Sequence, residues 1–317
     1  MVDDRACCRG YPATGMNGPA GEKLRDPALV DFGVDAAGHG RRLERLAGLL
    51  VDRPLPQAEG PRRRPAAWAD AAAIFRTAAE RGGGDWTFTA PVPDPWLVRV
   101  PIGPATLALE VRPAPSGQIG VFLEQVDQWR WLAGATPRGA VMLSLFAHSG
   151  AATLALAAAG AEVVHVDASK QAIALARRNA GASGLDDRPI RWVCEDAATF
   201  VARQIRRGAR FSGAVLDPPS WGHGPRGEAF AIDRDLVPLV EAVARLLAGD
   251  AGPPAGPLLL TCHSPAWHHR RLRDTLASAC TVAGLPPGRL ESGRLGCVDD
   301  SHRTLDLGDF ARRTPPA

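Results

Sequence analysis

Short apolar runs alternate with helical stretches from about residue 138 onward, and this alternation most constrains what the chain can fold into. A strand–helix unit that repeats five times predicts a parallel, doubly wound α/β sheet, because parallel neighbours need crossover connections. The predicted strands are 141–146, 162–166, 190–194, 213–216 and 258–261, and the predicted helices are 151–159, 169–180, 197–207, 236–248 and 267–283. Two further strand-like runs follow, near 289–292 and 304–310.

The chain before residue 136 has a different sequence pattern. Residues 1–27 are rich in Gly, Pro, Asp and Cys and lack periodicity, which predicts a disordered tail. Residues 28–135 predict a smaller N-terminal α+β subdomain, mainly of antiparallel strands, and residues 136–317 predict the larger α/β domain. The elements expected in the subdomain are a helix over 68–81, stopped by glycines at 82–84, and strands over 86–89, 96–100, 106–111 and 118–123.

Composition excludes several classes of protein. No run of about 18 apolar residues is present, so no membrane span is expected. The first residues also lack the apolar stretch of a signal peptide. Six scattered cysteines without a Cys-x-x-Cys pair favour free thiols in a reducing cytoplasm over disulfides or a metal site.

Arginine dominates the basic side chains. Thirty-seven basic and thirty-four acidic residues leave a net charge of +3, which by itself does not indicate a nucleic-acid partner. Only Lys23 and Lys170 are lysines, a bias that a GC-rich coding sequence explains. Alternatively, arginine clusters at 41–45, 62–64 and 203–210 form a footprint for phosphate groups.

Residues that follow the predicted strands are the candidate site, because such sheets bind ligands beyond the carboxyl ends of their strands. Gly150 follows the first strand, but the Gly-x-Gly-x-x-Gly fingerprint of a nicotinamide dinucleotide site is missing. Asp167 closes the second strand, where a carboxylate can accept hydrogen bonds from both hydroxyls of a ribose. Asp196 follows the third strand and is a candidate partner for an adenine amino group. The alternatives are a tight turn for Gly150, an N-cap at either Asp167 or Ser169 for the second helix, and an N-cap at Asp196 for the third.

The segment Asp217–Pro219 follows the fourth strand, and its two prolines predict a stiff rim rather than a strand interior. Trp221 comes shortly after and can stack on a base. His223 either takes part in the chemistry or is a surface loop residue. Cys262 ends the fifth strand and is either a nucleophile at the same cleft or a buried structural thiol.

In combination these residues resemble the class I S-adenosylmethionine-dependent methyltransferases. The resemblance is to the branch that contains the 23S rRNA cytosine-C5 methyltransferases and uncharacterised bacterial relatives. It extends over roughly residues 30–317, and its most specific stretches are Gly120–Gln125, Ser144–Gly150 and Leu216–Pro225. The segments Gly40–Arg45 and Asp52–Pro54 also look like the N-terminal segment of those relatives. The resemblance implies a seven-stranded Rossmann-like sheet with an antiparallel last strand.

The resemblance also implies a cofactor, S-adenosyl-L-methionine, and roles for individual residues. The loop Phe146–Gly150 would line the methionine portion, Asp167 would hold the ribose and Asp196 the adenine. The full set expected to bind the cofactor is Phe122, Gln125, Phe146, His148, Gly150, Asp167, Ala168, Asp196 and Ala197. The residues expected to face the methyl acceptor are Pro218, Pro219, Ser220 and Trp221, and the expected catalytic residues are Asp217 and Cys262.

The sequence is therefore expected to encode a cytoplasmic methyltransferase of class EC 2.1.1 that methylates a base of RNA, namely rRNA, without a metal. If the acceptor is cytosine C5, Cys262 is the nucleophile and Asp217 orients the base. An exocyclic amine, a small molecule or a protein are alternative acceptors that need no cysteine. A catalytically silent RNA-interaction module that keeps the cofactor site is a further alternative.

Overall fold

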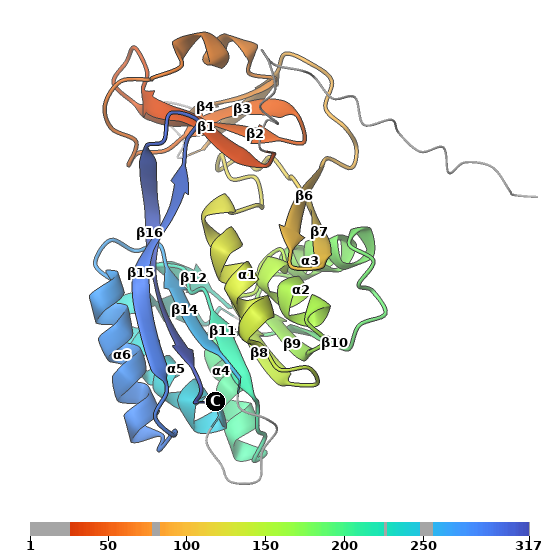
Figure 1. Cartoon of the computed structure of the whole chain (residues 1–317), viewed down its shortest axis with the longest axis vertical. Helices are drawn as coiled ribbons and strands as arrows, with labels where there is room; N and C mark the ends of the chain where they lie inside the picture. Colours follow the sequence, from red (N-terminus) through yellow and green to blue (C-terminus); the bar gives the residue numbers. More distant parts are fainter. Residues whose placement is uncertain (1–25, 78–82, 225–226, 248–255, 317) are drawn as a thin grey trace, which may run out of the picture.

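The computed structural model describes residues 26–77, 83–224, 227–247 and 256–316. A sheet of N-terminal strands lies at one end of the molecule and an α/β domain at the other (Figure 1). The long strands β15 and β16 of the α/β domain run up to the N-terminal sheet and join the two parts.

The α/β domain is built on a seven-stranded sheet with the order β10-β9-β8-β11-β14-β16-β15. Its strands are β8 (Val141–Leu145), β9 (Glu162–Asp167), β10 (Ile190–Cys194), β11 (Gly213–Leu216), β14 (Leu258–Cys262), β15 (Arg289–Val298) and β16 (Thr304–Thr314). The pairs between β10, β9, β8, β11 and β14 are parallel, whereas β16 is antiparallel to both of its neighbours. The predicted doubly wound sheet with an antiparallel last strand is confirmed.

Helices cover both faces of this sheet (Figure 1). They are α1 (Val126–Ala135), α2 (Ala151–Ala158), α3 (Lys170–Ala182), α4 (Ala197–Arg206), α5 (Ile232–Leu247) and α6 (His269–Val282). Side chains of β8 and β11 alternate between the two faces: Leu143 and Leu216 pack with α4, α5 and α6, whereas Met142 and Val215 pack with α1 and α2. Period-two burial on both faces explains why these strands are apolar throughout.

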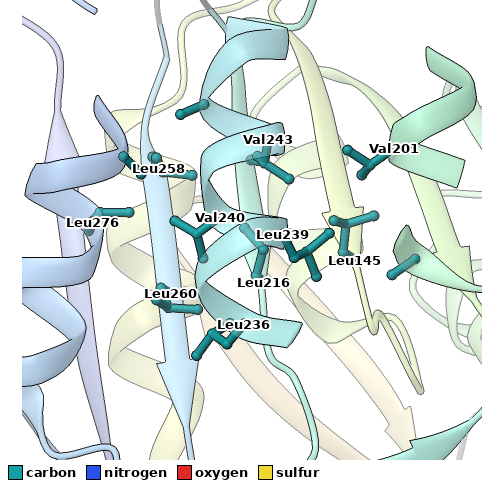
Figure 2. Close-up of a cluster of buried hydrophobic side chains, with 14 of the residues drawn as sticks. Leu145, Val201, Leu216, Leu236, Leu239, Val240, Val243, Leu258, Leu260 and Leu276 are labelled. Atoms are coloured by element: carbon teal, nitrogen blue, oxygen red, sulfur yellow. The ribbon is translucent and has the colours of Figure 1, made fainter. Parts of the chain in front are cut away.

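Figure 2 shows the first of these two layers, in which α5 lies over the strands. Leu236, Leu239, Val240 and Val243 from successive turns of α5 are at most 4% exposed. They pack with strand residues such as Leu260 and with side chains of α4 and α6. Spacings of three and four residues place them on one face of the helix.

The N-terminal part contains a five-stranded sheet with the order β1-β2-β3-β4-β5 and a separate hairpin, β6–β7. The strands are β1 (Ala28–Val34), β2 (Gly40–Leu46), β3 (Leu49–Pro54), β4 (Ala73–Thr77), β5 (Gly84–Phe88), β6 (Leu97–Ile102) and β7 (Ala105–Glu110). The hairpin lies against α3, where Asn179 Oδ1 accepts a hydrogen bond from the Glu110 amide at 2.8 Å. Two short strands, β12 (Trp221–His223) and β13 (Ala229–Ala231), form a further hairpin in the α/β domain.

Two expected elements of the N-terminal part are wrong. The helix expected over 68–81 is a 3-10 helix, η1 (Pro65–Asp70), followed by strand β4, while residues 78–82 lie outside the described residues. Ala73 and Phe75 alternate into the core while β4 pairs with β3 and β5, so sheet pairing overrides the local helical pattern. The strand expected over 118–123 is irregular backbone that leads into the 3-10 helix η2 (Leu123–Gln125) and then α1.

The tip of the β15–β16 hairpin is held to the N-terminal sheet by a buried carboxylate. Asp31 on β1 is fully buried and accepts hydrogen bonds from the Trp68 indole at 2.7 Å and from the Arg303 guanidinium at 2.5 Å. Arg303 also donates to the Phe32 carbonyl at 2.8 Å and to Asp299 at 2.9 Å. One guanidinium therefore joins strand β1 to the β15–β16 hairpin of the seven-stranded sheet.

Ion pairs within the fold occupy much of the N-terminal arginine clusters. Arg41 pairs with Asp52 at 2.6 Å and Arg42 with Glu44 at 3.6 Å, while Arg64 pairs with Asp300 at 2.7 Å. The first pair joins β2 to β3, the second lies within β2, and the third ties the N-terminal part to the turn between β15 and β16. These arginines therefore have a structural role beside the expected phosphate footprint. No helix among the described residues is long and apolar enough to cross a membrane.

Replacing Arg303 by Ala is expected to lower the free energy of unfolding by about 3 kcal/mol, because it leaves the Asp31 carboxylate buried without its cation. Urea unfolding of the variant measures this change. The matched control is Arg289→Ala, whose guanidinium is 78% exposed on the same hairpin and whose loss should change stability by less than about 1 kcal/mol. Equal effects of the two substitutions would contradict the assigned role of Arg303.

Candidate functional site

A cavity of about 440 Å³ opens beyond the carboxyl ends of β8, β9, β10 and β11. Many of the residues expected to form the site line this cavity: Phe122, Phe146, His148, Asp167, Ala168, Asp196, Ala197, Asp217, Pro218 and Pro219. The other expected residues, which are Gln125, Gly150, Ser220, Trp221 and Cys262, do not line it. Strands that run parallel end at the same edge, which brings side chains distant in sequence together.

The cavity lining also includes residues outside the expected binding and catalytic set: Val166, Ser169, Glu195, Gly222, His223, Gly224, Phe230 and His263. Among them, only His223 is a candidate for the chemistry from the sequence. His263 follows β14 directly, so its position after a predicted strand could have identified it as a site residue from the sequence. Phe230 belongs to β13 and packs on Phe146 with ring centroids 5.1 Å apart. No sequence motif predicts the contact between Phe230 and Phe146, because it depends on the tertiary position of the β12–β13 hairpin.

Asp167, at the end of β9, is tied to the loop that follows β8. Its Oδ2 accepts a hydrogen bond from the His148 amide and its Oδ1 accepts one from the Ser169 amide, both at 2.8 Å. An ionised carboxylate offers about four acceptor positions, so two remain for a ligand. The same side chain can therefore shape the loop and hold a diol. Ser169 caps α3 through its own hydroxyl, which accepts from the Ala172 amide at 3.2 Å.

The loop after β8 has an unusual backbone. Phe146, His148 and Gly150 have φ angles of 53°, 44° and 84°. Non-glycine residues rarely adopt such angles, and they do so where surrounding contacts hold them. Here the Ser149 hydroxyl donates to the Gly120 carbonyl, and the Asn179 amide donates to the Ser149 carbonyl, each at 2.8 Å. The cavity wall is thus fixed before any ligand binds.

Gly150 is the N-cap residue of α2 and is buried behind the cavity. A Cβ at this position would lie 2.8 Å from the Cβ of Ala176 on α3. Close helix packing and a left-handed backbone both require glycine here. Gly150 therefore shapes the loop from outside the cavity.

Asp196 lies at the end of β10 and caps α4, since its Oδ1 accepts a hydrogen bond from the Thr199 amide at 2.8 Å. The N-cap interpretation is therefore correct, and it coexists with a place on the cavity wall. Its neighbour Glu195 also lines the cavity and pairs with Arg203. Two carboxylates thus stand at this end of the cavity.

Asp217, at the end of β11, forms the opposite wall with Pro218 and Pro219. Its Oδ1 accepts a hydrogen bond from the Thr261 hydroxyl at 2.6 Å. The Ser220 hydroxyl forms a hydrogen bond with the Ser264 hydroxyl and ties the rim to the segment that follows β14. Trp221 is 60% exposed beside this rim and meets His223 edge to face, with ring centroids 4.2 Å apart.

Cys262 is 1% exposed and belongs to the core between the sheet and α5 and α6. Its Sγ accepts a hydrogen bond from the Ser264 amide at 3.3 Å. Burial raises the pKa of the thiol, so the nucleophilic thiolate is disfavoured. The structure thus has the features of the buried structural thiol. None of the described residues form a cluster of three or more His, Cys, Asp or Glu able to hold a metal ion.

Comparison with known proteins adds three relatives, although no family model matches the sequence. The crystal structure of a SAM-dependent methyltransferase from Agrobacterium tumefaciens is 31% identical, with a TM-score of 0.80, over 92% of this chain and 91% of that one. Ribosomal RNA large subunit methyltransferase K of Neisseria meningitidis is 31% identical over 41% of this chain. Ribosomal RNA large subunit methyltransferase I of Aeromonas hydrophila is 29% identical over 52%. The matches span only 37% and 40% of these two curated relatives.

Replacing Gly150 by Ala is expected to lower the free energy of unfolding by more than the roughly 1–2 kcal/mol of a left-handed alanine, because the new Cβ also collides with Ala176. Gly284→Ala is the matched control, since it has a similar φ of 70° and open space around the new Cβ. Thermal unfolding measures the stability of both variants, and the difference between them gives the effect of the steric collision. A Gly150→Ala, Ala176→Gly double variant should recover part of the loss, and failure to recover any would contradict the packing argument.

Proposed function

Because this chain belongs to the S-adenosylmethionine-dependent methyltransferases, its cofactor is S-adenosyl-L-methionine, and we propose that it methylates a base of RNA. The observation that carries the proposal is the cavity at the carboxyl edge of the sheet, with carboxylates at the ends of β9, β10 and β11. Membership is supported by likeness over nearly the whole of both chains, not by the site alone.

The cavity fits the proposed cofactor in size and in donors. A volume of about 440 Å³ lies within the range of roughly 300–1,000 Å³ for small-molecule sites. In this proposal Asp167 accepts hydrogen bonds from the ribose hydroxyls and Asp196 accepts one from the adenine amine. Phe146 and His148 line the methionine portion, with Phe122 beside them. Gln125, also expected to bind the cofactor, does not line the cavity, and its Nε2 lies 3.4 Å from Nε2 of His263.

RNA as the substrate is supported by the curated relatives, which are named as ribosomal RNA large subunit methyltransferases. The exposed Trp221 ring beside the cavity adds a surface on which an unstacked base can lie. Pro218 and Pro219 form the rim that such a base would pass. An rRNA substrate also leads us to propose the cytoplasm as the site of reaction.

A nitrogen of the base, such as an exocyclic amine, is the acceptor that this site supports best. A carbon acceptor such as cytosine C5 needs a cysteine nucleophile, and Cys262 is buried away from the cavity with a raised pKa. Asp217 lines the cavity and can accept a hydrogen bond from an amine. The bound cofactor supplies a methyl group made electrophilic by its sulfonium. The chain's own part is to align the acceptor and exclude water.

Transfer of label tests the proposal directly. The protein is incubated with S-adenosylmethionine carrying a tritiated methyl group and with RNA, protein and small-molecule fractions from cells that lack this chain. The proposal expects label in RNA, at a base after nuclease digestion. Label in the protein or small-molecule fraction alone would reject RNA as the substrate.

Asp167→Asn is expected to weaken binding of S-adenosylhomocysteine by about 10- to 100-fold, because a charge-assisted hydrogen bond is worth about 1.5–3 kcal/mol. Isothermal calorimetry measures the dissociation constant. Asp186→Asn, an exposed aspartate outside the cavity, is the control and should bind as the wild type does. Unchanged affinity in Asp167→Asn would refute the ribose assignment.

Cys262→Ala is expected to keep the rate of methyl transfer within about threefold of the wild type, since the proposed acceptor needs no cysteine adduct. Cys280→Ala, a second buried thiol in the same core, controls for packing loss. Single-turnover transfer to the labelled RNA fraction gives the rates. A loss of 1,000-fold or more confined to Cys262→Ala would restore the cytosine-C5 mechanism.

A further inference from the structure

His263 is held at the cavity in a single tautomer. It follows β14, and its Nδ1 lies 2.8 Å from the carbonyl oxygen of Leu307 on β16. A carbonyl oxygen can only accept, so Nδ1 carries the proton and donates it. In a neutral ring the other nitrogen, Nε2, then holds a lone pair.

The Nε2 atom of His263 faces the wall where the methyl acceptor is proposed to lie. It is 3.8 Å from Oδ1 of Asp217 and 3.4 Å from Nε2 of Gln125. At 3.4 Å the contact between the Gln125 amide and His263 Nε2 is long for a hydrogen bond, so it occupies the Nε2 lone pair only weakly. The Asp217 carboxylate already accepts from the Thr261 hydroxyl, which keeps it beside the ring. A basic nitrogen and a carboxylate thus stand together at one corner of the cavity.

A second cavity, of about 490 Å³, also has His263 in its lining. His263 is the residue that the linings of the two cavities share, so the cavities adjoin at this side chain. The second cavity is bordered by α6, by β16 and by Gln57 from the N-terminal part of the chain. Arg270 lines it and forms no ion pair among the described residues. A substrate that fills this space would have its reactive atom next to His263.

We infer that His263 is the base that takes the proton of the methylated nitrogen, an inference that rests on the proposed function. The lone pair of the acceptor nitrogen forms the new bond to the methyl carbon while the carbon–sulfur bond breaks and leaves its electron pair on sulfur. The proton released by that nitrogen passes to the lone pair on Nε2. The Nδ1 hydrogen bond to Leu307 and the neighbouring Asp217 stabilise the resulting imidazolium.

Several charged groups surround the ring. Glu124 of η2 places a carboxylate oxygen 4.0 Å from Nδ1, and Asp217 lies 3.8 Å from Nε2. The other titratable or charged side chains around the second cavity are His268, His269, Arg270, Arg294, Asp306 and Asp309. The nearest charges are both carboxylates, and they lie where they can stabilise an imidazolium once it forms.

The test compares His263→Asn with the wild type in single-turnover methyl transfer. The asparagine amide can still donate to the Leu307 carbonyl, but it offers no basic nitrogen. The rate should fall by about 100-fold or more, while S-adenosylhomocysteine binds within about threefold of the wild type by calorimetry. The wild-type rate should increase with pH until the base is unprotonated, and this increase should be absent in the variant. His39→Asn, an exposed histidine of the N-terminal sheet, should behave as the wild type does.

The cell fraction that becomes labelled tests the proposed function, whereas the ratio of wild-type to His263→Asn rates tests the role of His263. Label outside RNA would reject the proposed function, yet the ratio of wild-type to His263→Asn rates in that fraction still tests the base. A rate within threefold of the wild type, or a retained pH dependence, would overturn the role of His263. Nitrogen-15 NMR of the wild type bound to S-adenosylhomocysteine tests it without any acceptor: Nδ1 protonated and Nε2 unprotonated at pH 7.5 is expected, and the opposite tautomer would overturn it.

Discussion

Burial of the seven-stranded sheet on both faces confines its polar chemistry to the edge where the parallel strands end. Helices cover each face, and strand residues such as Leu143 and Met142 are fully buried on opposite sides. A charged side chain inside these layers would lose its hydration without a partner. Aspartates therefore stand at the strand ends, where Asp167, Asp196 and Asp217 meet one cavity.

The carboxylates at this edge also stabilise the local structure of the cavity wall. Asp167 accepts from two backbone amides and holds the strained loop after β8 in place. Asp196 caps α4, and Asp217 is bonded to Thr261. The same carboxylates therefore stabilise the fold and are proposed to bind the ligand. Preorganised walls reduce the ordering that a ligand must otherwise impose when it binds.

The catalytic sheet was predictable from the sequence because its strands and helices alternate in short, strongly apolar segments. The strands 190–194 and 213–216 were predicted at their observed bounds. The N-terminal sheet was harder, since pairing with β3 and β5 rather than local pattern makes β4 a strand. The burial of Cys262 and the tautomer of His263 follow from contacts with α5 and with Leu307, which no local pattern records.

Mass spectrometry of rRNA nucleosides from a strain that lacks this chain tests the central claim most directly. Comparison with the parent strain, and with the deletion strain that carries the wild-type chain or the Asp217→Asn variant, assigns any change to this site. The account predicts that one methylated nucleoside disappears on deletion, returns with the wild type and returns at a reduced level with Asp217→Asn. An unchanged set of methylated nucleosides in the deletion strain would contradict it.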